Sequence, residues 1–88
     1  MEINVLRDAI DKLDCEIVEL LKSRMSISAE IAEYKRANNI PVLDKAREDA
    51  LLEKIASRSG EMSNYTREIY LEILKQSKAY QEKLISKN

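Results

Sequence analysis

Two cations at the centre of an apolar helical stripe are the first residues suited to chemistry. The segment 5–37 contains no Gly or Pro and reads as one helix. At 100° per residue, Arg24 and Lys35 lie at about 0° and 20° from Leu6. Burying an unpaired cation is costly, and no Asp or Glu of this helix lies within about 70° of the stripe. We therefore expect an anion to meet them. The same stripe carries Leu6, Ile10, Leu13, Ile17, Leu20, Leu21, Ile27 and Ile31.

Two further segments, 44–48 and 77–81, contribute polar side chains that could join Arg24 and Lys35. Ser77 and Gln81 are one helical turn apart within the apolar face of a helix predicted over 64–85, and both can hydrogen-bond a ligand without carrying charge. The other segment is a charged helix start, with Asp44, Arg47 and Glu48. Together these residues predict a small polar pocket inside a helix bundle, complementary to an anion.

Each residue also has an interpretation without a ligand. Lysine and arginine can extend their charged ends past a core into water, and the residues with hydroxyl and amide groups can hydrogen-bond the backbone. Asp44 suits the N-cap of a helix, and Arg47 and Glu48 could be solvated surface. The convergence of all of them favours the pocket.

Composition indicates the class of protein. At 88 residues the chain is expected to form one domain, residues 1–88. Hydrophobic residues make up 44% and charged residues 35%, with one Gly and one Pro, which is typical of an all-α protein. The net charge of -1 provides no basic surface for nucleic acid.

Reactive groups are few. The chain has no His and one cysteine, Cys15, which we interpret as an inactive thiol. The first ten residues carry acids where a signal peptide needs an apolar run, and no segment reaches membrane-spanning length. These features predict a cytoplasmic protein that does not associate with membranes.

Three helices are predicted, over about 5–37, 44–58 and 64–85. Pro41 discourages helix at the residue before it, Gly60 suits a left-handed C-terminal cap, and Ser63 or Asn64 suits an N-cap. The first helix would be roughly 50 Å long, longer than a compact chain of this size is wide. We therefore expect much of its apolar face to be covered by a partner.

The position of Arg7 indicates that this partner is a second copy of the chain. Arg7 would lie about 26 Å along the axis from Arg24 and about 42 Å from Lys35, so it cannot reach their pocket in its own chain. If two long helices pair antiparallel around Ile17 and Val18, Arg7 of one chain arrives between Arg24 and Lys35 of the other. We therefore expect an intertwined homodimer, a helical bundle with two shared pockets.

With these residues in place, the sequence resembles the all-helical AroQ class of chorismate mutases. The resemblance spans nearly the whole chain, and its segments occur in the family's order and spacing. These are LRDAIDKLD (6–14), LLKSR (20–24), EIAEYK (30–35), PVLDKAREDALLEKI (41–55) and SKAYQ (77–81). The resemblance implies an isomerase that converts chorismate to prephenate towards phenylalanine and tyrosine, as an intertwined dimer of three-helix chains and without a nucleophile, metal or cofactor.

The resemblance also implies roles for the site residues. Arg7 of the neighbouring chain would hold the enolpyruvyl carboxylate of chorismate, and Arg24 would hold the ring carboxylate. Lys35 and Gln81 would donate to the ether oxygen, which gains negative charge in the transition state. Glu48 would accept a hydrogen bond from the ring hydroxyl, and the backbone N–H of Asp44 would donate to the same hydroxyl. Arg47 and Ser77 would complete the wall near the ring carboxylate.

Two alternatives remain open. An isochorismate-pyruvate lyase shares this fold and its arginine–lysine pocket, although the segment 44–48 resembles the mutases better. A non-catalytic helical dimerisation module would explain the stripe but not Arg24 and Lys35 at its centre. Activation by a partner enzyme of the same pathway is also compatible with the sequence.

The amide at position 81 leads to a prediction about pH. Some members of the family carry Glu there, which must be protonated to donate, whereas the amide of Gln81 does not titrate. We expect the rate to be nearly constant between about pH 5 and 8. Initial rates of chorismate consumption across this range check it, and a sharp loss above about pH 6 would contradict it.

Overall fold

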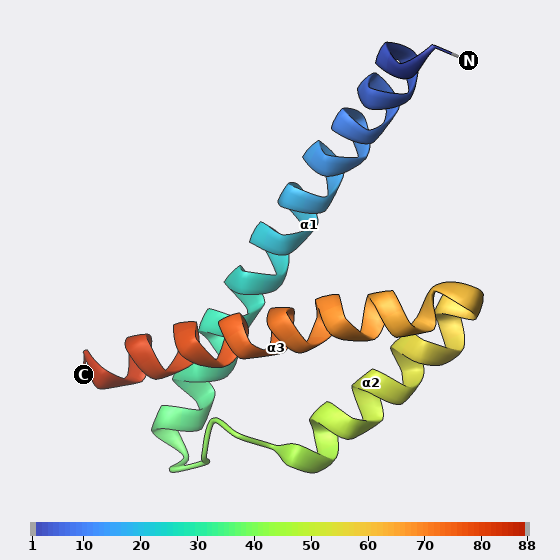
Figure 1. Ribbon diagram of the computed structural model, residues 1–88. Coiled ribbons are helices and arrows are strands. Elements are labelled where there is room, and N and C mark those ends of the chain that lie inside the picture. The colour runs from blue at the N-terminus through green and yellow to red at the C-terminus, as the bar shows by residue number, and fades with distance from the viewer. Residues whose placement is uncertain (1, 88) are drawn as a thin grey trace.

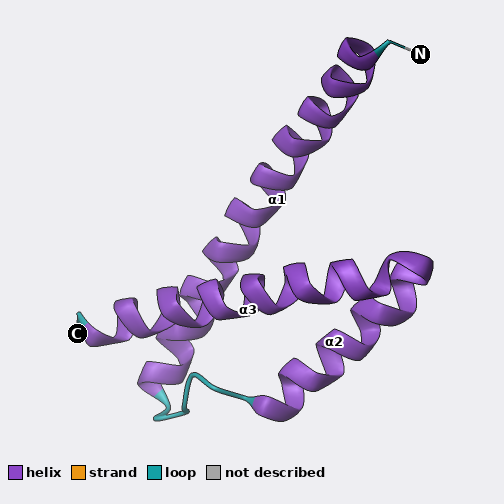
Figure 2. Cartoon of the chain, in the orientation of Figure 1, coloured by secondary structure: helices purple, strands orange, loops and turns teal. Residues whose placement is uncertain are grey.

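One helix dominates the molecule. In the computed structural model, which describes residues 2–87, α1 covers Ile3–Ala37. It is followed by α2 (Lys45–Ser59), a single turn of 3₁₀-helix η1 (Gly60–Met62) and α3 (Ser63–Ser86). Figures 1 and 2 show α1 as an arm that extends far beyond the other two helices. No strand occurs in residues 2–87, so the predicted all-α class is confirmed.

The end of α1 is fixed by a Schellman motif. Asn39 adopts a φ of 54°, the left-handed conformation that Asn tolerates better than most residues. This turn brings the Ile40 N–H to the Lys35 carbonyl at 2.8 Å and the Asn39 N–H to the Arg36 carbonyl at 3.4 Å. Pro41 follows, and the chain is non-helical until α2.

Asp44 caps α2 as predicted, because its side chain accepts from the Arg47 N–H at 3.0 Å. Gly60 has the expected positive φ of 55°, but its ψ of -129° is outside the left-handed helical region, and it begins η1. The expected cap at Ser63 or Asn64 is wrong. The cap position of α3 is Met62, without a side-chain hydrogen bond, because η1 leads directly into α3.

The three helices pack through α3. It contacts both α1 and α2, whereas α1 and α2 do not pack against each other within the described residues. Small side chains allow α3 to approach α1 closely: Ser28 and Ala32 on α1 and Ser77 on α3 are all buried. The buried apolar residues are few, namely Ala32, Val42 and Leu74.

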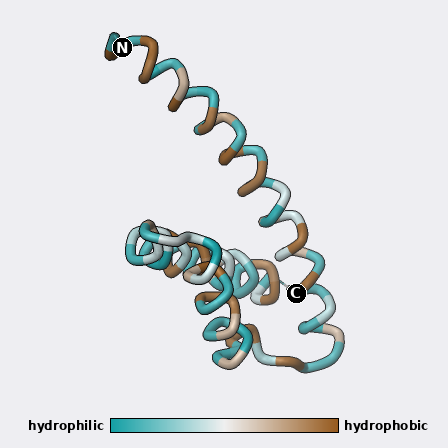
Figure 3. The backbone as a smooth tube through the Cα atoms, turned by 90° about the vertical axis from the view of Figure 1, so that its right-hand side faces the viewer, coloured by the Kyte–Doolittle hydropathy of each residue, from teal (hydrophilic) through white to brown (hydrophobic). Residues whose placement is uncertain are grey.

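The rest of the apolar stripe on α1 is uncovered. Leu13 is 56% exposed and Leu20 is 70% exposed, and the large apolar residues from Ile3 to Leu21 are exposed throughout. In Figure 3 hydrophobic and hydrophilic segments alternate along the projecting arm. Within residues 2–87 no helix is both long and apolar enough to cross a membrane.

Size measurements agree with this shape. The radius of gyration is 16.1 Å, against about 12 Å for a compact chain of this length. The accessible surface is 7141 Å², against about 5,300 Å² for a compact monomer of this mass. The isolated chain therefore exposes far more surface than a folded monomer of its size.

Candidate active site

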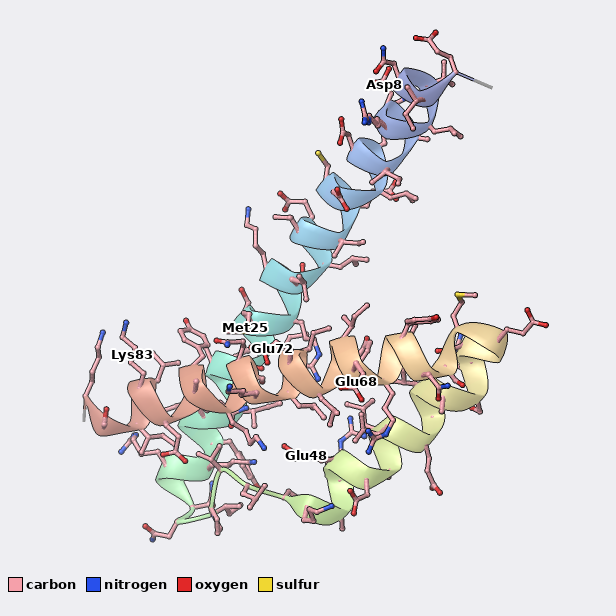
Figure 4. All side chains as sticks on the ribbon, in the orientation of Figure 1. Asp8, Met25, Glu48, Glu68, Glu72 and Lys83 are labelled. Atoms are coloured by element: carbon pink, nitrogen blue, oxygen red, sulfur yellow. The ribbon has the colours of Figure 1, made fainter. Side chains whose placement is uncertain are left out.

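A cavity of about 410 Å³ lies where α1, α2 and α3 converge. That volume is in the range of small-molecule sites. Seven of the eight predicted side chains line it, from all three helices and the N-cap of α2: Arg24, Lys35, Asp44, Arg47, Glu48, Ser77 and Gln81. The eighth, Arg7, does not. In Figure 4 its neighbour Asp8 lies near the far end of the arm, while Glu48 lies between α2 and α3.

The first cation, Arg24, is half-buried at the start of the α1–α3 crossing. Among residues 2–87 no carboxylate pairs with it, and none pairs with Arg47, which is exposed at the start of α2. Two guanidinium groups that line one cavity and lack carboxylate partners are well suited to a planar anion such as a carboxylate.

Lys35 has a defined position on the cavity wall. Its ammonium donates to the Val42 carbonyl at 2.7 Å, in the loop between α1 and α2. An ammonium has three N–H donors, so two remain for a ligand. The bond also fixes the loop that leads to Asp44, and it therefore connects α1 to the start of α2.

Gln81 is one of three buried polar residues of the cavity; the other two are Ser28 and Ser77 at the helix crossing. Gln81 is 6% exposed, and its Oε1 has no hydrogen-bond partner within residues 2–87. A buried amide oxygen without a partner destabilises a fold by about 1–3 kcal/mol. An apolar residue of the same size would avoid that cost, so stability does not explain the amide, whereas a hydrogen-bonding ligand would.

Two polar residues of the cavity were not predicted. Ser28 hydrogen-bonds Ser77 across the α1–α3 crossing, with 2.7 Å between the hydroxyl oxygens. Lys78 forms an ion pair with Glu48, 2.9 Å from Nζ to Oε2. Sequence patterns held a weak signal for both, because Ser28 falls about 40° from the stripe centre and Lys78 follows the buried Leu74 by one turn.

Charge in the cavity is unbalanced. Four cationic side chains line it, against two carboxylates: Arg24, Lys35, Arg47 and Lys78 against Asp44 and Glu48. The excess of two positive charges matches a ligand with two negative charges. No group of three or more His, Cys, Asp or Glu side chains suited to a metal occurs in residues 2–87, and Cys15 is exposed on α1.

Comparison with known proteins identifies similar chains. The chorismate mutase type II family matches residues 6–82. A bifunctional chorismate mutase/prephenate dehydratase from Buchnera aphidicola subsp. Schizaphis graminum is 36% identical over 84 residues, which is 92% of this chain and 22% of that protein. One from Aquifex aeolicus is 36% identical over 61 residues, 69% of this chain and 17% of that protein. This chain therefore spans about a fifth of the length of the curated relatives it matches.

A solved structure agrees with the fold. A conserved hypothetical protein from Pyrococcus furiosus is 39% identical, with a TM-score of 0.72. The match covers 90% of this chain and 93% of that one.

The polar groups of the helix crossing can be tested through stability. We expect Gln81→Met to raise the free energy of unfolding by about 1 kcal/mol, because the unpartnered amide oxygen is removed. Ser77→Ala should lower it by about 1 kcal/mol, since the Ser28 hydroxyl loses its partner. Urea denaturation at one fixed protein concentration measures both. A loss of stability in Gln81→Met would contradict the assignment of Gln81 as a group kept for a ligand.

Proposed function

The chain belongs to the chorismate mutase type II family, and from this premise we propose that it isomerises chorismate to prephenate, on the route to phenylalanine and tyrosine. The observation that carries the proposal is the cavity of α1, α2 and α3, with its two excess positive charges and its buried amide at Gln81. Chorismate is a dianion with two carboxylates, which matches the excess charge, and its ether oxygen can accept a hydrogen bond from the N–H of the amide.

The reaction is a unimolecular pericyclic rearrangement. The ether C–O bond breaks while a C–C bond forms between the enolpyruvyl group and the ring, so no proton acceptor or nucleophile is needed. The protein has to hold the substrate in its compact conformer and stabilise the negative charge that grows on the ether oxygen. A cavity lined by cations and a buried amide fits these needs.

Four residues are proposed as catalytic: Arg24, Lys35 and Gln81, and also Glu48 at the start of α2. Arg24 would pair with the ring carboxylate through its guanidinium fork. The two free N–H groups of the Lys35 ammonium would reach a carboxylate and the ether oxygen. Gln81 would donate its amide N–H to the same oxygen. The near-complete burial of Gln81 would make this contact strong, because a donor in a water-excluded site is worth more than one in water.

The start of α2 is proposed to recognise the substrate ring. Glu48, whose side chain is 18% exposed, would accept a hydrogen bond from the ring hydroxyl. The backbone N–H of Asp44 would donate to that hydroxyl. Arg47, which follows the cap in the first turn, and Ser77 on α3 would complete the wall near the ring carboxylate.

A second copy of the chain is proposed to complete each site. The isolated chain exposes about 1,800 Å² more surface than a compact monomer, and a standard stable interface buries about 800 Å² of each partner. Antiparallel pairing of two α1 arms would cover the exposed stripe from Ile3 to Leu21. It would also bring Arg7 of one chain to the cavity of the other, where it would hold the second carboxylate of chorismate.

The proposed cellular setting is the cytoplasm. It is supported by the unpaired cysteine, Cys15, and by the water-soluble substrate.

The reaction is tested by following chorismate in the ultraviolet. We expect turnover by the wild type and a loss of about 10²–10³-fold in kcat for Lys35→Ala, the usual effect of removing a transition-state donor. Lys45→Ala is the matched control, because Lys45 is exposed and pairs only with its neighbour Asp49. Acid conversion of the product to phenylpyruvate identifies prephenate. Pyruvate released from isochorismate, with chorismate unchanged, would instead indicate the lyase.

Sharing of the site between chains is tested by mixing inactive variants. Arg7→Ala and Lys35→Ala are each expected to be nearly inactive. In a mixed dimer, one of the two sites combines the intact Lys35 of one chain with the intact Arg7 of the other. Random reassociation should therefore restore about a quarter of wild-type activity.

The control mixture contains Arg7→Ala and the Arg7→Ala/Lys35→Ala double variant, which has no intact combination. Absence of recovery in the first mixture, with mixed dimers shown to form, would contradict the shared site.

A further inference from the structure

The ion pair of Lys78 and Glu48 differs from the other ion pairs of the described chain. The others join residues one to four positions apart on one helix, and all of those side chains are well exposed. Lys78 on α3 and Glu48 on α2 are thirty residues apart, and their side chains are 34% and 18% exposed. This pair therefore joins two helices in a partly water-excluded place.

The pair is also part of the cavity wall. The Lys78 ammonium lies 2.9 Å from one Glu48 carboxylate oxygen and 3.2 Å from the other, so it contacts both. Both residues line the cavity, and Figure 4 shows Glu48 on α2, facing α3. The geometry fixes the orientation of the carboxylate relative to the space in which the substrate would bind.

A carboxylate in this cavity presents an electrostatic difficulty. The proposed substrate has two negative charges, and an unpaired Glu48 would repel it. An ammonium in contact with both oxygens neutralises that repulsion. A carboxylate has about four lone-pair positions, so Glu48 keeps the capacity to accept from a hydroxyl while it accepts from Lys78.

We propose that Lys78 is a positioning residue for substrate recognition. It holds Glu48 in place and neutralises it, so that a carboxylate can serve as a hydroxyl acceptor inside a site for a dianion. This assignment rests on the proposed function. Lys78 takes no part in the bond changes, so its effect falls on substrate binding and only slightly on the chemical step.

The experiment is a double-mutant cycle in steady-state kinetics with chorismate. Lys78→Met is expected to raise KM about tenfold and to change kcat by less than about threefold. Lys78→Arg, which keeps the charge, should stay within about threefold of the wild-type KM. In the Glu48→Gln background, Lys78→Met should change KM by less than about twofold, because the charge that it neutralises is gone.

Lys75→Met, an exposed lysine one turn earlier on α3, is the matched control and should leave KM unchanged. Circular dichroism and urea midpoints establish that each variant is folded.

Three outcomes would overturn the assignment. An unchanged KM in a folded Lys78→Met variant would show that the ion pair has no role in binding. An equal loss in the wild-type and Glu48→Gln backgrounds would show that Lys78 acts on the substrate directly. Absence of turnover by the wild type would overturn the proposed function, and the assignment with it, which separates that failure from the first two.

Discussion

The site depends on one arrangement, the packing of α3 against two helices that do not pack against each other. Because α1 and α2 have no direct packing in the described residues, a space remains between them with α3 along one side. The cavity occupies that space. Small residues at the crossing, Ser28 and Ala32 on α1 and Ser77 on α3, allow the close approach that fixes α3 over α1.

In this arrangement polar residues occupy positions that could otherwise form an apolar core. Among residues 2–87 three apolar residues are buried, whereas Ser28, Ser77 and Gln81 are also buried. An 88-residue chain is already near the size at which a single core becomes marginal. Much of the apolar surface that could stabilise the chain lies on the projecting arm. The proposed dimer would bury this arm of α1, which also carries Arg7. Dimerisation would therefore both stabilise the chain and bring Arg7 to the cavity of the partner.

A unimolecular rearrangement asks for groups that are already in place before the substrate arrives. Three contacts hold part of the cavity wall in place. Lys35 is hydrogen-bonded to the Val42 carbonyl, Glu48 is paired with Lys78, and the cap at Asp44 sets the first turn of α2, which carries Arg47. These contacts join α1 to the loop before α2, α2 to α3, and the cap residue to the first turn of α2, which limits the reorganisation needed on binding.

The sequence by itself determined the features that depend on local spacing. The period of the apolar residues predicted three helices and placed Arg24 and Lys35 on the stripe. The residue type at position 44 predicted the N-cap of α2, and Pro41 predicted that α1 ends before it. The distance of Arg7 from the cavity followed from helix rise alone. These features need only the backbone geometry of one helix, which neighbouring residues fix.

The tertiary structure decided the features that depend on two helices meeting. The turn at Gly60–Met62 replaced the expected cap of α3, because a 3₁₀ turn runs directly into that helix. In the sequence Ser28 is a small residue without a distinct role, and the packing of α3 against α1 places Ser77 beside it. Glu48 was predicted as a site residue, but nothing in the sequence paired it with Lys78. Their pairing depends on the angle and register at which α2 and α3 pack, which are set by side-chain contacts between residues far apart in the chain, and no local spacing reports them.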